Sequence, residues 1–335
     1  MTSNVSHKDN CFDLLRLIAA SMVIFFHQNM FTGGGFVTDP SDWFPMDSIW
    51  VQIFISLSGF LVSMSFMRSK SFNDFMWKRI KRLFPALVFC NFVVVFLIAP
   101  FWQEHALQYI ISLSTIKSFI KMSILFSYGN DIPHLWTDYG WLQAANAPIW
   151  TLTHEFFLYI LGSLAFGLSR TWKAPTALLI IFMLCQIFIA PYLAEKSFYS
   201  MNAHHFTELG TNFSIGALMY VTINSWNSKN TKIFLAAISV IILFALRQEQ
   251  GITIAGRVCI SVLTIIIGVS FKDLILKGKM DISYGMYIWA FPIQAIVINV
   301  LHLGFYYGTV ATFIITGIVA AISRKYIEEP FMRRK

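Results

Sequence analysis

The apolar stretch from Phe12 to Phe31 constrains this chain most, because it is long enough to cross a bilayer, which takes about 20 such residues. It nevertheless carries Asp13, Arg16 and His27. An ionisable side chain inside a membrane helix costs about 2.5 kcal/mol or more, so each of them needs a partner or a function. The stretch therefore predicts a membrane helix whose polar side chains face the inside of a bundle.

The spacing of these three residues places them on one stripe of the helix. Arg16 and His27 are eleven positions apart, which is three turns plus about 20°, and about 16 Å along the axis. Asp13 lies one turn before Arg16, on the neighbouring part of the same face. Two interpretations remain open for the helix alone. Either Asp13 pairs with Arg16 and His27 is a structural interior histidine, or these three residues take part in a reaction.

Composition extends this prediction to the whole chain. Hydrophobic residues make up 56% and charged residues only 13% of the 335 positions, whereas a soluble domain has about 25% charged residues. We therefore expect an all-α polytopic membrane bundle that forms a single domain over residues 1–335. The predicted spans are about residues 12–31, 48–67, 84–102, 149–168, 174–193, 206–223, 233–248, 253–271, 282–301 and 306–324.

Lysines and arginines sort to one side of these ten spans, so the net charge of +8 reflects membrane topology and not nucleic-acid binding. If the N-terminus is inside, the inner side holds Lys8, Arg68, Lys70, Lys78, Arg79, Lys81, Arg82, Arg170, Lys173, Lys229, Lys232, Lys272, Lys277, Lys279, Arg324, Lys325, Arg333, Arg334 and Lys335. The outer side holds Lys117, Lys121, Lys196, Arg247 and Arg257. Both termini are therefore expected to be cytoplasmic.

The inner segment 68–85 concentrates six of these cations. Arg79 and Arg82 are three residues apart and would face the same way on a helix. Guanidinium groups bind phosphates bidentately, so this pair, with the neighbouring Lys78 and Lys81, predicts a clamp for a donor with several phosphates, such as a coenzyme A thioester. The alternative is topology control and contact with anionic membrane lipids.

A second candidate position lies in the span 149–168. Glu155 is about five residues below the outer end of this span, roughly 8 Å deep, and His27 is about four residues below the outer end of the first span. Equal depths predict that His27 and Glu155 share an outer-leaflet cavity. His154 points about 100° away from Glu155 and is the weaker candidate.

The region between residues 105 and 147 departs from the spanning pattern. Residues 105–128 are apolar with Lys117 and Lys121 on one helical face, which is typical of an interfacial or re-entrant helix. Residues 130–147 include Pro133, Trp136 and Trp141 and fit an outer loop resting on the membrane surface. Such a loop either carries function or serves as a structural cap.

Over nearly its whole length the chain resembles the acyltransferase family 3 proteins, membrane-bound O-acyltransferases that modify surface carbohydrates. Six segments in the family's order carry the resemblance: Arg16 and His27 with Asp13 upstream, Phe54–Phe60 with Ser58, Arg79–Pro85, Trp150–Glu155, Ser283–Trp289 with Tyr284, and Ile327–Pro330. Many members have a histidine after the Ser283–Trp289 segment. This chain has Ala290, so that role is absent here or is taken by Gln294 or another group.

The resemblance implies a donor site and a reactive histidine. Acetyl-CoA would dock from the cytoplasm against Arg79 and Arg82, and its pantetheine arm would pass Arg16. His27 would act as general base on a sugar hydroxyl or as a transient acyl carrier, and both routes suit an imidazole. Glu155 would orient His27 or bind the sugar, and the carboxylate expected to hold Arg16 is that of Asp13.

The resemblance also implies an acceptor and a location. The acceptor would be a lipid-linked or nascent polysaccharide, such as lipopolysaccharide O-antigen, on the outer side of a bacterial inner membrane. Ser58, Trp150, Tyr284 and Trp289 are the candidate substrate contacts. Aromatic rings stack on sugars, but interface anchoring explains tryptophans equally well. No metal site is predicted, because the eight histidines are dispersed and the pair His204–His205 alone cannot hold an ion.

Other classes of membrane protein remain as alternatives. A glycan or lipid transporter or flippase would use the same bundle, although the chain shows no repeated halves. A polysaccharide polymerase would be expected to carry a larger outer loop. Among acyltransferases, peptidoglycan, a secreted oligosaccharide and a secondary metabolite are alternative acceptors, and the sequence does not distinguish these.

Overall fold

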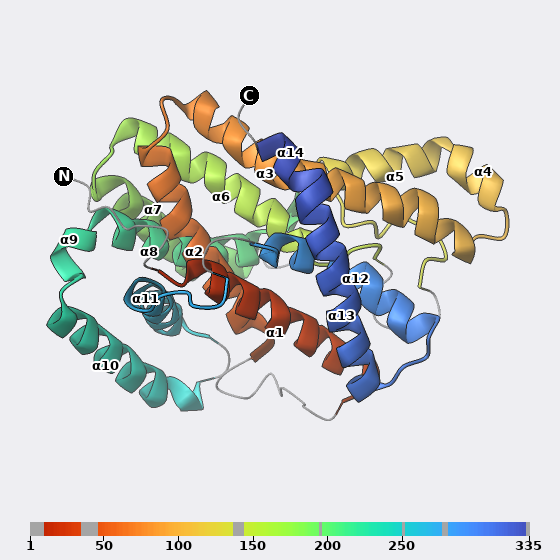
Figure 1. Cartoon of the computed structure of the whole chain (residues 1–335). Helices are drawn as coiled ribbons and strands as arrows, with labels where there is room; N and C mark the ends of the chain where they lie inside the picture. The colour runs from red at the N-terminus through yellow and green to blue at the C-terminus, as the bar shows by residue number, and fades with distance from the viewer. Residues whose placement is uncertain are drawn as a thin grey trace.

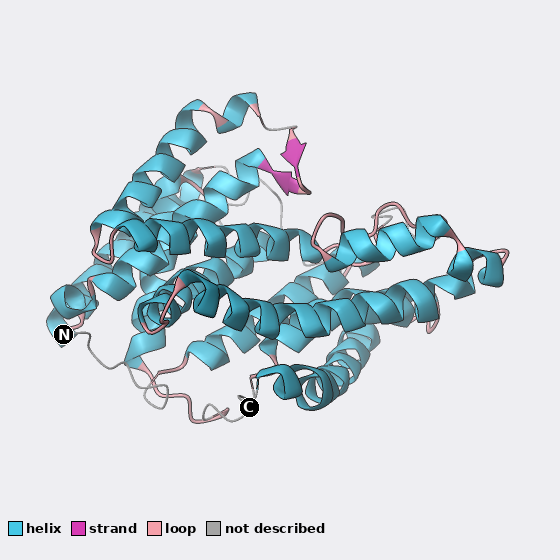
Figure 2. Cartoon of the chain, turned by 90° about the horizontal axis from the view of Figure 1, so that it is seen from above, coloured by secondary structure: helices cyan, strands magenta, loops and turns pink. Residues whose placement is uncertain are grey.

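The computed structural model describes residues 10–34, 46–136, 144–193, 196–249, 252–276 and 281–332 as a bundle of helices (Figure 1). Lys8, Lys277, Lys279 and residues 333–335, which entered the predicted charge sorting, lie outside the described residues, and so does Trp141. The only strands in the described ranges are β1 (Ser197–Phe198) and β2 (Met201–Asn202), an antiparallel pair at one edge of the bundle (Figure 2). The all-α prediction is confirmed.

Ten helices of 16 to 22 residues lie in the described ranges, and each corresponds to one predicted span. They are α1 (Phe12–Thr32), α2 (Met46–Met67), α3 (Phe72–Phe92), α6 (Ile149–Leu168), α7 (Lys173–Phe188), α8 (Ala203–Val221), α10 (Lys229–Ala245), α11 (Ile254–Ser270), α12 (Ser283–Asn299) and α13 (Phe305–Ser323). The shorter elements are η1 (Val93–Ile98), η2 (Ala99–Trp102), α4 (Ala106–Ile111), α5 (Leu113–Ser123), η3 (Ala190–Tyr192), α9 (Ile223–Trp226), η4 (Leu246–Gln248), η5 (Arg324–Glu328) and α14 (Glu329–Met332).

Five segments of the described chain are long and apolar enough to cross a membrane by themselves. They cover residues 12–32, 48–67, 72–102, 149–168 and 305–332. Two further helices, α7 and α11, are apolar but shorter. The chain therefore has helices that are able to cross a membrane. Length and apolarity support five crossings, and the full set of ten stays a prediction.

The third span begins earlier than the predicted residue 84, because the basic segment is itself helical. The hydroxyl of Ser71 accepts a hydrogen bond from the backbone N–H of Asp74 at 3.1 Å and caps the start of α3. One turn later, Lys78 Nζ lies 2.7 Å from the Asp74 carboxylate. Apolarity alone does not reveal this start, because the first three turns of α3 carry the positive charges.

Helix α1 packs between two neighbours whose directions fix a depth scale for the site. It runs antiparallel to α2, with Phe12 against Phe60 and the Arg16 guanidinium over the Phe54 ring. It runs parallel to α12, because Arg16 pairs with Asp281 just before α12 and His27 meets Phe291 two and a half turns along it. Residues further along α1 therefore lie at the same depth in the bundle as residues further along α12.

Two glycines bring α2 and α8 into direct backbone contact. A methyl group added at Gly59 would lie 2.0 Å from the carbonyl oxygen of Phe213, and one at Gly216 would lie 2.1 Å from that of Ser56. Small residues at such crossings let membrane helices approach closely. Polar groups complete the contact, since Asn212 donates to the hydroxyl of Ser261, which lies 2.8 Å from that of Ser56.

Beyond Phe92, α3 continues through η1 and η2 and is followed by α4 and α5, which extend from the main bundle in Figure 1. Helix α5 packs back against α3 and carries Lys117 and Lys121. Lys121 forms an ion pair with Asp131 at 3.0 Å. The helix expected in this region is therefore present as two short helices, and its position at a membrane surface stays a prediction.

We expect Gly216→Ala to lower the free energy of unfolding by about 1–3 kcal/mol, because the new methyl group meets a backbone oxygen that cannot rotate away. Thermal unfolding in detergent would measure the loss. Gly317→Ala on α13 is the matched control, since no atom lies within 4 Å of the added methyl group and alanine favours helix. A Gly216→Ala protein as stable as wild type would contradict the close packing of α2 on α8.

Candidate active site

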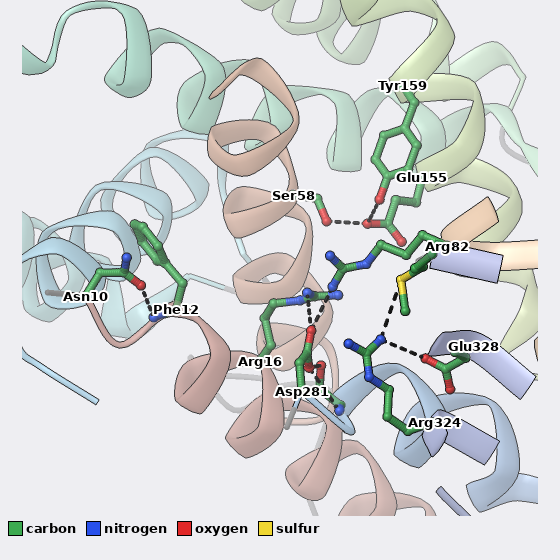
Figure 3. Close-up of polar contacts among 12 residues, drawn as sticks. Asn10, Phe12, Arg16, Ser58, Arg82, Glu155, Tyr159, Asp281, Arg324 and Glu328 are labelled. Atoms are coloured by element: carbon green, nitrogen blue, oxygen red, sulfur yellow. Dashed lines mark hydrogen bonds and ion pairs between the residues drawn. The ribbon is translucent and has the colours of Figure 1, made fainter. Parts of the chain in front are cut away.

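A shared carboxylate gathers two arginines at one end of α1. Asp281 Oδ2 lies 3.0 Å from Arg16 Nη1 and 2.7 Å from Arg82 Nη2 (Figure 3). The Arg16 side chain is 10% exposed and that of Asp281 is 14% exposed. Three chain segments, α1, α3 and the start of α12, therefore meet in one buried ionic cluster.

The local sequence prepares Asp281 for this role. Its Oδ1 accepts hydrogen bonds from the backbone N–H and the hydroxyl of Ser283, which leaves Oδ2 for the arginines. Burial alone would raise the pKa of Asp281, but the two guanidinium groups and Ser283 outweigh it and hold that pKa well below its usual range. The stabilisation that follows is complete above about pH 4 and is lost as the pH falls through the depressed pKa.

The other residues of the predicted phosphate clamp divide into two sets. Arg79 Nη2 donates to Ser65 on α2 at 2.8 Å, and its guanidinium lies within electrostatic reach of Arg82 and Arg16. Lys78 instead forms its ion pair with Asp74 inside α3, and Lys81 lies over the exposed Trp77 ring at 5.6 Å. The structure thus brings Arg79, but not the two lysines, to the arginine cluster.

Glu155 on α6 is held beside this cluster. Its Oε1 accepts hydrogen bonds from the hydroxyls of Ser58 on α2 and Tyr159 one turn further along α6 (Figure 3). Glu155 is 8% exposed, and its carboxylate is close enough to attract the Arg16 guanidinium. Ser58, predicted as a substrate contact, therefore touches the candidate catalytic carboxylate.

The prediction that Glu155 and His27 lie at equal depth is wrong. Thr151, one turn before Glu155, contacts the hydroxyl of Tyr287 on α12, whereas His27 contacts Phe291, one turn beyond Tyr287. Glu155 therefore lies about two turns, or about 11 Å, nearer to the Arg16 end than His27 does.

The reason is that α6 begins inside the bundle. Pro292 has no N–H, so the carbonyl of Ile288 is left without its helical partner. That carbonyl accepts a hydrogen bond from Asn146 Nδ2 at 2.8 Å, and Asn146 is fully buried. The chain just before α6 is thereby drawn down to the level of Ile288, so counting inward from a membrane surface misplaces Glu155.

His27 lies three turns along α1 from Arg16, among aromatic rings. Its ring stacks on Phe31 at 5.8 Å and meets the edge of Phe291 at 6.4 Å. Ala290, where many family members have a histidine, packs in an apolar cluster with Ala20 and Ile24 of α1. One turn further, Gln294 Nε2 donates to the Ile24 carbonyl at 2.9 Å and lies 3.2 Å from Gln28 Oε1. Gln294 thus ties α12 to α1 beside His27.

The remaining predicted substrate contacts lie at different places. The Tyr284 hydroxyl donates to the Leu83 carbonyl at 2.7 Å and ties α12 to α3 next to Arg82. The buried Trp289 packs edge-on against Phe89. Trp150 lies at the start of α6, 5.2 Å from the rings of His154 and His205. The structure does not gather these residues into one surface.

Near Trp150, the Glu208 carboxylate contacts His204 and His205 on its own helix and Arg257 on α11. The contact with Arg257 joins α8 to α11. Within the described ranges, no group of three or more His, Cys, Asp or Glu side chains is arranged to hold a metal ion. This cluster therefore serves as an ionic contact between helices.

The chain matches a known protein family over most of its length. The family model described as an acyltransferase domain, acyltransferase family 3, matches residues 9–324. The chain belongs to this family. The resemblance noted from the six sequence segments is therefore confirmed.

Two curated relatives cover almost the whole chain. An O-acetyl transferase of Shigella phage Sf6 is 34% identical over 334 residues, which span 98% of this chain and 97% of the relative. Nodulation protein 10 of Rhizobium leguminosarum bv. viciae is 26% identical over 363 residues, spanning 98% and 94%. No solved structure matches the chain significantly. The family and the first relative identify the chain as an acyltransferase enzyme of the O-acetyltransferase kind.

Sequence reasoning missed Asp281 and named Asp13 as the carboxylate that holds Arg16. The ion pair of Arg16 is with Asp281, while Asp13 attracts it more weakly from one turn away. Asp281 lies two residues before Ser283, and this position next to the Ser283–Trp289 motif was the available signal. Tyr159 and Tyr287 were also missed, because nothing in a single span shows which tyrosine faces a neighbouring helix.

We expect Asp281→Asn to cost about 3–5 kcal/mol of stability, because it leaves the buried Arg16 without its compensating charge. Asp131→Asn is the matched control and should cost less than about 1 kcal/mol, since its partner Lys121 is 43% exposed. Unfolding of both variants in detergent at neutral pH checks the difference. Equal losses would show that the Asp281 cluster does not hold the three segments together.

Proposed function

We propose that the protein moves an acetyl group from cytoplasmic acetyl-CoA to a sugar hydroxyl of a bacterial surface polysaccharide, such as lipopolysaccharide O-antigen. The observation that carries this proposal is the arrangement on α1: a buried arginine cluster at one end and His27 about 16 Å further along. An extended pantetheine arm is of comparable length. A phosphate-bound donor at the cluster would therefore present its thioester to His27.

The proposal places all ten long helices across the bacterial inner membrane, with both termini cytoplasmic. The sorting of lysines and arginines supports this orientation. So do the apolar side chains on the outside of the shorter helices, such as Ile241 and Phe244 on α10, which are 66% and 61% exposed. With this orientation the Arg16–Asp281–Arg82 cluster is at the cytoplasmic end, where acetyl-CoA is available, and His27 is nearer the outer surface.

Donor binding is assigned to Arg79 and Arg82. Both have guanidinium groups at the inner end of α3, and bidentate contact with the diphosphate of coenzyme A suits their geometry. Asp281 keeps Arg82 and Arg16 from repelling each other before the donor arrives. Lys78 and Lys81, directed to Asp74 and Trp77, would contribute only to the long-range attraction of an anionic donor.

His27 is assigned to the transfer step. As general base it takes the proton of the sugar hydroxyl while the sugar oxygen attacks the thioester carbonyl, the carbon–sulfur bond breaks, and the proton passes to the departing coenzyme A thiolate. As acyl carrier, its ring nitrogen attacks first, forms an acetyl-histidine and releases coenzyme A, and the sugar oxygen then displaces the imidazole. Trapping acetyl-His27 in the absence of acceptor distinguishes the two routes.

Glu155 takes a different role from the one its predicted depth suggested. It lies beside the arginine cluster with Ser58 and Tyr159, so it would line the donor site rather than orient the histidine. Its carboxylate offers an acceptor for the amide N–H groups of a pantetheine arm. The two hydroxyls fix its orientation for that contact.

The name of the phage relative supports acetyl as the transferred group, and family membership supports a carbohydrate acceptor. Trp150, at the start of α6, is the candidate aromatic contact for the sugar. Family membership also sets aside the transporter and polymerase alternatives. A lipid-linked or nascent polysaccharide is the proposed acceptor, and peptidoglycan, an oligosaccharide or a secondary metabolite would be a different outcome of the test below.

Mass spectrometry of surface polysaccharide tests the proposal in cells that carry the wild-type gene, His27→Ala or no gene. We expect the polysaccharide of wild-type cells to gain the mass of added acetyl groups. The polysaccharide of His27→Ala cells should gain none, at equal protein level in the membrane. His105→Ala is the matched control, because His105 is exposed and makes no capping bond, and should retain full acetylation. Acetylation that persists in His27→Ala would contradict its assignment, and an added mass other than acetyl would change the donor.

A further inference from the structure

The C-terminal segment Ile327–Pro330 begins inside η5 (Arg324–Glu328) and runs on into α14. η5 is a π-helical turn that ends α13 and packs against α3. Single π-helical turns of this kind occur frequently at functional sites. Figure 3 shows Arg324 and Glu328 of this turn beside the Arg16–Asp281 pair.

A close helix contact brings the turn to this place. A methyl group at Gly285 would lie 2.9 Å from the Ala320 side chain, so α13 passes directly over the start of α12. Ala320 is one turn before Arg324. The neighbouring Tyr284 ties α12 to Leu83, next to Arg82, and lies within electrostatic reach of Glu328. The end of α13 is therefore fixed against both segments that build the arginine cluster.

Glu328 is the buried anchor of this turn. It is 2% exposed, and its carboxylate attracts Arg324 from its own turn and Arg82 from α3. Burying a carboxylate this deeply is costly, and the attraction of the two arginines offsets part of that cost. Glu328 thus orients Arg324 toward the cluster in the way that Asp281 orients Arg16.

The polar contacts of the Arg324 guanidinium are long. Its Nη1 lies 3.5 Å from Glu328 and 3.6 Å from Met332 Sδ, and its Nε lies 3.9 Å from Glu329. The Nε is buried without a hydrogen-bond partner among the described residues. A guanidinium with long contacts and a buried donor left over is suited to receive an oxyanion.

We propose that Arg324, oriented by Glu328, binds the 3′-phosphate of the coenzyme A donor, which makes the Ile327–Pro330 segment part of the donor site. This inference rests on the proposed function. Coenzyme A carries two separate phosphate groups, a diphosphate joined to the pantetheine arm and a monoester on the ribose. Arg79 and Arg82 lie where the arm starts and match the diphosphate, so Arg324, a separate guanidinium on the adjoining turn, matches the monoester.

The experiment compares the Kd of coenzyme A with that of 3′-dephospho-coenzyme A, by calorimetry on the detergent-purified full-length protein. Wild type should bind coenzyme A about tenfold more tightly, the amount expected for one charge-assisted contact. Arg324→Gln should abolish this preference by weakening coenzyme A alone. Glu328→Gln should reduce the preference in the same direction, because Arg324 loses its orienting charge.

Arg170→Gln is the matched control, because it removes an equal charge from an exposed arginine that the charge sorting places on the same side, over the Phe66 ring. It should keep the wild-type preference. Arg324→Lys retains the charge without the bidentate fork and should show an intermediate preference, so it carries the test if Arg324→Gln is not recovered folded.

The outcomes separate this inference from the proposed function. Equal affinity of wild type for both ligands, or an unchanged preference in Arg324→Gln, would overturn the inference while leaving the donor intact. Equal weakening of both ligands in Arg324→Gln would also overturn it, and would point to a structural or lipid-phosphate contact of Arg324. Binding of neither ligand by wild type would overturn the proposed function and this inference with it.

Discussion

The structure depends on the compensation of buried positive charge at one end of the bundle. An arginine inside a membrane protein is costly unless a partner compensates its charge, and Asp281 does this for Arg16 and Arg82 together. The two arginines come from α1 and α3, so the single carboxylate also fixes these helices against the start of α12. Glu328 repeats the arrangement for the end of α13. Structural stability and the proposed donor recognition would therefore rest on the same charges.

Exceptions to regular helix geometry then place the other groups. Pro292 frees the Ile288 carbonyl, Asn146 binds it, and α6 consequently starts deep in the bundle with Glu155 near the arginine cluster. Gly285 lets α13 approach α12 closely enough for the terminal turn to reach α3. Pro292 removes a helical hydrogen bond and Gly285 gives up a side chain, and together they bring Glu155 and Arg324 beside the arginine cluster.

The sequence predicted the helices but not their depths relative to one another. Apolar length located all ten long helices, and the spacing of Arg16 and His27 placed both on one face of α1, because these properties are local. Asp281 was missed as the partner of Arg16 because it lies 265 positions away and Asp13 offered a local substitute. The depth of Glu155 was misjudged because a hydrogen bond to another helix, rather than the membrane surface, sets the start of α6. Tertiary contacts of this kind leave no periodic signal in the chain.

In the mechanism we propose, a donor held at the arginine cluster extends along α1 to His27. A cryo-electron microscopy structure of the protein with coenzyme A bound would test this most directly. We expect phosphate density at Arg79, Arg82 and Arg324, a pantetheine arm passing Glu155, and the thiol sulfur beside His27. Coenzyme A bound elsewhere on the molecule, or with its thiol directed away from His27, would contradict it.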